Sequence, residues 1–173
     1  MQPFGPPHMQ APIVLLERTP AIYELLLRDL KAETLEWKPS ADRWSIEEVL
    51  EHVVRIERVY ERRARAVVAD DNPRLPKFET PSKAGGPAKS AQEHLDEFVA
   101  LRRAFVFFLH SIPSTCGGRM GIHPELGPVT LSEMLHEMAN HDLGHLRQIA
   151  ELYRAQTFYP HAGPFQKYSI PKP

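Results

Sequence analysis

The sequence has little of several features that mark particular classes of protein. It contains one cysteine, Cys116, so an intrachain disulfide is excluded and a reducing compartment is expected. No segment approaches the ~20 apolar residues that a membrane-spanning helix needs. The N-terminus also lacks the basic start and apolar run of a signal peptide. We therefore expect a cytoplasmic protein that does not enter the membrane.

The sequence also has no excess of positive or of negative charge. The 21 basic and 22 acidic side chains leave a net charge of −1, and the isoelectric point lies near 6.8. Proteins that bind nucleic acids usually carry a basic face and have a high isoelectric point. The charge balance therefore argues against DNA or RNA as a partner.

Proline is abundant, with 17 residues, but it is missing from three long stretches. These stretches are residues 40–72, 88–112 and 129–159. A proline in a helix interior costs ~3 kcal/mol, so these are the places where long helices can form.

Each proline-free stretch contains a capping box, in which a hydroxyl and a glutamate three residues later satisfy the first helical N–H groups. The three boxes are Ser45–Glu48, Ser90–Glu93 and Thr130–Glu133. Each is followed by apolar residues at helical spacing. We therefore predict helices over residues 46–70, 91–111 and 131–156.

An earlier helix is predicted from Thr19 or Pro20 to Lys31, with Thr19 as its cap and Pro20 in its first turn. Its expected inward residues are Ile22, Leu25, Leu26 and Leu30. Four helices with long connecting loops predict an all-α fold, a four-helix bundle over residues 12–158. Residues 1–11 are expected to be a flexible N-terminus, and residues 159–173 an extended tail rich in proline and aromatic residues.

Three histidines lie at positions that the helical patterns place inward. His141 and His145 continue the stripe of the last helix after Met138, and His52 lies beside Val53 on the second helix. Residues four apart in a helix differ by roughly 40° and ~6 Å, so His141 and His145 can reach one metal ion. Burying an unpaired polar ring costs roughly 1–3 kcal/mol. Either one ion satisfies all three rings, or each ring has its own hydrogen-bond partner in the core.

Three motifs together resemble the DinB-like superfamily over residues 15–154. They are Trp44-Ser-x-x-Glu-x-x-x-His52, Thr130-Leu-x-Glu133 and His141-Asp-x-x-His145-x-x-Gln148. The resemblance implies a four-helix bundle, often a homodimer, in which His52, His141 and His145 bind one divalent ion. Nickel or zinc is the first expectation for that ion, with iron and manganese as further candidates. The name of the family refers to induction by DNA damage and does not imply binding to DNA.

Several other residues are candidates for a role near such an ion. Glu48 and Glu137 could each hold a histidine by its second nitrogen, although a solvated helix face is the favoured interpretation of both. Gln148 could reach the metal region or its water, or bond to a neighbouring helix. Arg119 and His123 lie in the long loop 113–128, which could contact a substrate or be an ordinary exposed loop. Trp44 is interpreted as packing beside the site.

The resemblance supports an enzyme that acts on a small molecule. The better understood relatives are metal-dependent transferases that use a low-molecular-weight cellular thiol, and a metal-dependent hydrolase is the close competitor. A metal-binding stress-response protein without catalysis is the alternative. A plain structural bundle with three core histidines is the third hypothesis.

Overall fold

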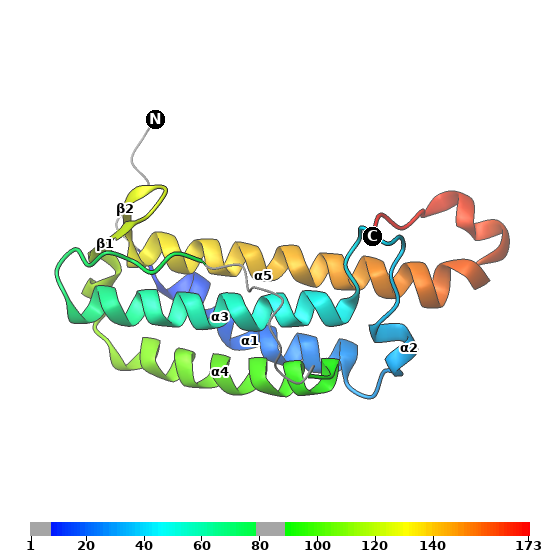
Figure 1. Cartoon of the computed structure of the whole chain (residues 1–173), viewed down its shortest axis with the longest axis horizontal. Helices are drawn as coiled ribbons and strands as arrows, with labels where there is room; N and C mark the ends of the chain where they lie inside the picture. Colours follow the sequence, from blue (N-terminus) through cyan, green and yellow to red (C-terminus); the bar gives the residue numbers. More distant parts are fainter. Residues whose placement is uncertain (1–7, 79–88) are drawn as a thin grey trace.

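The computed structural model describes residues 8–78 and 89–173. Figure 1 shows a long helical bundle with one small hairpin at one end. Its elements are α1 (Gln10–Leu27), α2 (Ala32–Leu35), α3 (Ile46–Ala69), α4 (Ala91–Ser111), β1 (Met120–His123), β2 (Gly127–Thr130) and α5 (Leu131–Tyr153). The prediction of a four-helix bundle is therefore confirmed, and the two-stranded sheet is a minor addition. Within the described ranges, no helix is both long and apolar enough to span a membrane.

The four long helices form a ring. α3 packs against α4 and α5, and α1 packs against the same two helices, so α1 and α3 lie on a diagonal. α1 and α5 run in one direction, whereas α3 and α4 run in the other (Figure 1). Because α3 and α4 are parallel, the chain between them has to return along the bundle. The described part of this connection follows α3, where Arg63 donates hydrogen bonds to the carbonyl oxygen of Pro76.

The three predicted capping boxes are all present. In α3, α4 and α5 the cap hydroxyl accepts from the third helical N–H, and the glutamate accepts from the cap N–H. These bonds fix the first residues of the helices at Ile46, Ala91 and Leu131 as predicted. α5 ends at Tyr153 and continues as a π-helical turn, Arg154–Phe158.

The predicted start of α1 is wrong. The helix begins at Gln10, and Pro20 lies in its interior. Proline has no N–H to donate to the carbonyl four residues earlier, and that carbonyl, at Leu16, accepts a 3.1 Å hydrogen bond from Arg102 Nη1 instead. The predicted inward stripe is wrong at Ile22 and Leu25, which are 38% and 87% exposed, whereas Tyr23 and Leu27 are buried. Leu26 and Leu30 do pack against the core as predicted.

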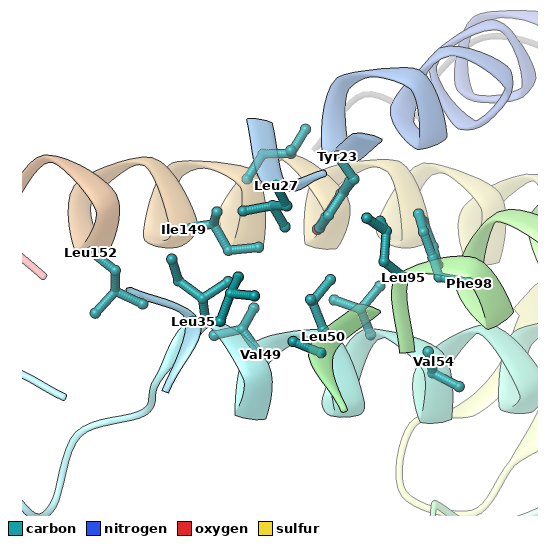
Figure 2. Packing of buried hydrophobic residues seen from close by; sticks show 14 of the residues in the cluster. Tyr23, Leu27, Leu35, Val49, Leu50, Val54, Leu95, Phe98, Ile149 and Leu152 are labelled. Atoms are coloured by element: carbon teal, nitrogen blue, oxygen red, sulfur yellow. The ribbon is translucent and has the colours of Figure 1, made fainter. Parts of the chain in front are cut away.

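Two clusters of buried apolar side chains fill the bundle. One cluster lies toward the α2 end, where side chains from α1, α2, α3, α4 and α5 meet (Figure 2). The other lies toward the hairpin and includes Leu16, Phe105 and Met138. Between the two clusters, α3, α4 and α5 each contribute one buried charged residue to a common ion-pair network: Glu57, Arg102 and Asp142. These three residues are called the buried triad below.

The loop 113–128 contains more regular structure than predicted. Residues Ser114–Gly118 form a 3₁₀ turn, and β1 pairs antiparallel with β2 from Met120↔Thr130 to His123↔Gly127. The return connection also docks on β1, because Leu75 N donates to Ile122 O at 2.9 Å and Ile122 N donates to Pro73 O at 2.8 Å. The hairpin is therefore tied to the connection that follows α3.

The C-terminal tail is not extended as predicted. It forms two 3₁₀ segments, Tyr159–His161 and Gly163–Tyr168. Its end folds back on the last turn of α5 and the π-helical turn that follows, where Glu151 accepts from the backbone N–H of Lys172 and Arg154 donates to Ser169. Several tail side chains remain exposed, including Phe165, Tyr168 and Ile170.

Candidate metal centre

Three imidazole rings converge between α3 and α5, and we call them the three-histidine cluster. His52 comes from α3, and His141 and His145 come from α5, one helical turn apart. The Nε2 atom of His141 lies 3.1 Å from Nε2 of His52 and 3.1 Å from Nε2 of His145. One nitrogen from each ring lies within 4.8 Å of the other two. The sequence pattern therefore predicted correctly that these rings come together.

The cluster lies at the edge of the core, not on the buried stripe itself. All three rings are half-buried, whereas Val53, Asp142 and Leu146 beside them are buried. Met138 is buried as predicted, so the inward side of α5 is the expected one, and only His141 and His145 lie at its margin. Such a position keeps the rings accessible from outside the bundle, which a binding site for a small ligand requires.

The hydrogen bonds around the rings fit a bound cation. Nδ1 of His145 lies 3.0 Å from Oε1 of Gln148, which can only accept, so the proton of this ring sits on Nδ1 and Nε2 has a free lone pair. His141 Nε2 faces two other Nε2 atoms, and a single proton cannot make two good hydrogen bonds. His141 Nδ1 is buried without a partner in the part of the chain that the structure describes. One divalent ion would accept all three lone pairs at once.

The electrostatic environment keeps the rings neutral. Burial, together with the neighbouring rings His145 and His141, lowers the pKa of His52 to about 4. Burial and His145 lower the pKa of His141 to about 4, although the Asp142 carboxylate opposes this shift. Burial also lowers the pKa of His145, against the opposing effects of Gln148 and Asp142. A metal ligand has to be a neutral imidazole, so the protonation state fits the donor set.

Two aromatic side chains flank the cluster. The Trp44 ring lies 5.1 Å from the His52 ring and stacks on His145 with an interplanar angle of 8° and a centroid distance of 6.3 Å. Trp44 is 40% exposed, so it lines the outside of the site and is only partly core. Phe78, at the end of the described return connection, meets the His52 ring edge-on at 6.2 Å.

Of the three predicted neighbours Glu48, Glu137 and Gln148, only Gln148 has a described hydrogen bond to a cluster histidine. Glu48 instead completes its capping box and pairs with Lys38, and Glu137 accepts a long hydrogen bond of 3.5 Å from Asn140. Neither glutamate has a described hydrogen bond to a cluster histidine.

Arg119 and His123 lie at the hairpin end of the bundle. Arg119 donates to the carbonyl oxygens of Val67 and Asp70 and pairs with Asp71. His123 Nδ1 accepts from the backbone N–H groups of the hairpin turn. Val67 follows His52 by fifteen residues on α3, a rise of about 22 Å. Both side chains thus stabilise the hairpin, and their described contacts do not reach the cluster.

The buried triad is the feature that the sequence analysis missed. Arg102 donates from Nε and Nη2 to Glu57 at 2.7–2.9 Å, and from Nη1 and Nη2 to Asp142 at 2.7 and 3.2 Å. With the bond to Leu16 O, all five guanidinium N–H groups have acceptors. A sequence signal existed: each member follows a buried apolar residue by four positions, namely Val53, Phe98 and Met138. A charged residue at such a position requires a partner.

A helical bundle that presents converging imidazoles from facing helices belongs to the class of bundles that bind metal ions. Residues 15–149 match the family model of the DinB superfamily, and the chain belongs to this superfamily. Among solved structures, it is similar to YfiT from Bacillus subtilis, described as "a probable metal-dependent hydrolase with an unusual four-helix bundle topology". The TM-score is 0.77 at 17% identity, with 89% of this chain and 92% of YfiT covered, so the likeness concerns the fold. No curated protein matches the chain.

Proposed function

We propose that the protein is a metal-dependent enzyme whose three-histidine cluster holds one divalent ion. The convergence of three neutral imidazole nitrogens, all within 4.8 Å of one another on an accessible face, carries this proposal. His52, His141 and His145 would be the ligands, and Gln148 would fix the orientation of His145 by accepting its Nδ1 proton. Nickel and zinc are the first candidates, because imidazole ligands suit both.

Three protein ligands are typical of catalytic sites, which keep a position open for substrate. When bound, the ion would lower the pKa of a water or thiol that coordinates it. The chain itself contributes the aromatic rings of Trp44 and Phe78, which flank the ligands and provide apolar surface for a small substrate. Together these groups would position the substrate next to an activated nucleophile.

Two reaction classes are compatible with this arrangement. Transfer of a low-molecular-weight thiol to an electrophilic substrate is the function that the family resemblance supports. Hydrolysis is the second candidate, and it is favoured by the structural likeness to YfiT, which is described as a probable metal-dependent hydrolase. A metal-binding stress-response protein without turnover remains the alternative to both.

The first experiment is to count metal ions in protein purified without a metal-affinity tag. We expect about one divalent ion per chain by mass spectrometry, and none in the triple variant His52→Ala, His141→Ala, His145→Ala. Wild-type protein that takes up no nickel, zinc, iron or manganese would refute the proposal and leave a bundle with three core histidines.

The metal-loaded protein would then be tested on electrophilic and on hydrolysable substrates, with and without added thiols. Turnover that requires a thiol supports the transferase, and turnover without one supports the hydrolase. Both activities should disappear in His52→Ala. A protein that retains its metal but shows no turnover on either panel would favour the non-catalytic alternative.

We also propose that the protein is a cytoplasmic homodimer. The family resemblance supports the dimer, and the single cysteine supports a reducing compartment. The exposed Phe165, Tyr168 and Ile170 of the tail are candidates for the contact surface. Sedimentation equilibrium at micromolar concentration tests this directly, because a monomer there would exclude the dimer.

A further inference from the structure

The buried triad contains two carboxylates but only one guanidinium. Glu57, Arg102 and Asp142 are each exposed by only 1%. All four carboxylate oxygens accept hydrogen bonds from Arg102. A protonated carboxylic acid would need an acceptor for its own O–H, and none is paired with these oxygens among the described residues. The geometry is that of two ionised carboxylates around one cation, which leaves a net charge of about −1 inside the bundle.

The triad is adjacent to the three-histidine cluster. Asp142 follows His141 directly in α5, and Glu57 lies little more than one turn beyond His52 in α3. Asp142 also lies only three residues before His145, so it is within one helical turn of both ligand positions of α5. Both carboxylates therefore lie little more than one helical turn from a cluster histidine along their own helices. Burial and the Asp142 charge raise the pKa of the Tyr23 hydroxyl, so Tyr23 adds no formal charge to this region.

We propose that the buried triad is a counter-charge for the ion: Glu57 and Asp142, held by Arg102, strengthen divalent-cation binding at the three-histidine cluster without coordinating the cation. The proposal rests on the proposed metal site. Three neutral imidazoles bring no charge, so a bound ion keeps its full +2 charge. Inside a protein, where the effective dielectric constant is about 20 or less, an unscreened carboxylate nearby attracts such an ion strongly.

The triad also has a cost that a bound ion would offset. All three side chains are only 1% exposed, so the excess negative charge of the metal-free bundle is held with almost no water around it, which costs free energy. A buried network with no net charge would hold the three helices together equally well. The second carboxylate, which makes the triad negative, is explained if the triad balances the charge of a bound ion.

The test separates charge from shape at one position. Glu57→Gln keeps the size of the side chain and removes its charge, whereas Glu57→Asp keeps the charge and changes the packing. Nickel(II) affinity would be measured by competition with a coloured chelator, together with the urea unfolding midpoint of the metal-free protein. We expect Glu57→Gln to bind nickel about tenfold more weakly, or about 1.4 kcal/mol, and Glu57→Asp to bind within about threefold of the wild type.

Glu61→Gln is the matched control. Glu61 lies one turn further along α3 and pairs with Arg65 at the surface, where water and salt screen its charge. Its neutralisation should leave nickel affinity within about twofold of the wild type. Asp142→Asn repeats the test from α5 and takes the place of Glu57→Gln if that variant does not fold.

Two results would overturn the inference. One is an equal nickel affinity in Glu57→Gln and the wild type, and the other is a loss that follows the unfolding midpoint equally in Glu57→Gln and Glu57→Asp. In both cases the wild type still binds nickel, so the proposed metal site stands. A wild type that does not bind nickel or another divalent ion would instead refute the proposed function.

Discussion

Trp44 lies beside the candidate metal centre, so its fluorescence can report whether an ion is bound there. Its indole ring is parallel to the imidazole of His145 and close to that of His52. The only other tryptophan, Trp37, packs against the apolar cluster at the α2 end. An ion held by the cluster would therefore lie near one indole and change its emission.

We predict that nickel(II) quenches the tryptophan fluorescence of the wild type and of Trp37→Phe. In Trp44→Phe most of this quenching should be lost, because the remaining indole has no described contact with the cluster histidines. The measurement is a fluorescence titration with magnesium as the control ion, since magnesium prefers oxygen ligands. Equal quenching in the two variants would contradict the proposed position of the ion.

Individual site residues were predictable where one local spacing decides their position. The helical spacing of His141 and His145 also placed Gln148 three residues on, within reach of His145. Glu48 shows the limit of such reasoning, because its capping box and Lys38 occupy its carboxylate. Phe78 could not be found from the sequence, since it reaches His52 only through the path of an irregular connection.

Among the elements, the hairpin depends on a close approach at Gly121. A Cβ atom there would lie 2.7 Å from Leu75 Cδ2 and 2.8 Å from Val67 Cγ2. These distances are far inside van der Waals contact, and Val67 and Leu75 are both buried. A side chain at this position would push the hairpin away from α3 and from the return connection.

We predict that Gly121→Ala lowers the free energy of unfolding by about 1–3 kcal/mol. Urea unfolding followed by circular dichroism provides the measurement. Gly144→Ala is the control, because a Cβ atom there meets nothing within 4 Å, and an exposed helix interior gains up to about 1 kcal/mol from this change. A neutral effect of Gly121→Ala would mean that the hairpin does not dock as described.

Helix starts were predictable from the capping boxes, because both partners of each bond lie within four residues. The start of α1 was not, since Thr19 and Pro20 form a normal start signal. The compensation for Pro20 is a bond from Arg102, 86 residues away, and no local pattern indicates it. The parallel arrangement of α3 and α4 was not predicted either, because the connection between them fits several paths.

For the whole molecule, the lowered pKa values of the cluster predict how stability depends on pH. The pKa values of His52 and His141 fall to about 4 in the folded chain, against about 6.5 for an unperturbed histidine. Between these values the unfolded chain binds protons that the folded chain does not. Stability from these residues is therefore complete above about pH 6.5 and decreases as the pH falls toward 4.

We predict that the metal-free protein becomes less stable between neutral pH and about pH 5. The triple variant His52→Gln, His141→Gln, His145→Gln should show a smaller dependence over the same interval, because glutamine does not titrate. Urea unfolding at both pH values tests this. The same slope in both proteins would mean that other groups, such as the half-buried His94, whose pKa burial also lowers, dominate the acid sensitivity.

The separation of His52 and His141 by 89 residues bears on the order of events during folding. His141 and His145 come together as soon as one turn of α5 forms, within the microseconds of helix formation. His52 joins them only after a loop that contains all of α4 has closed, and such long-range contacts form slowly. We therefore expect the complete cluster to exist only in chains in which α3 and α5 are already packed, and an ion that needs all three rings would bind only to those chains.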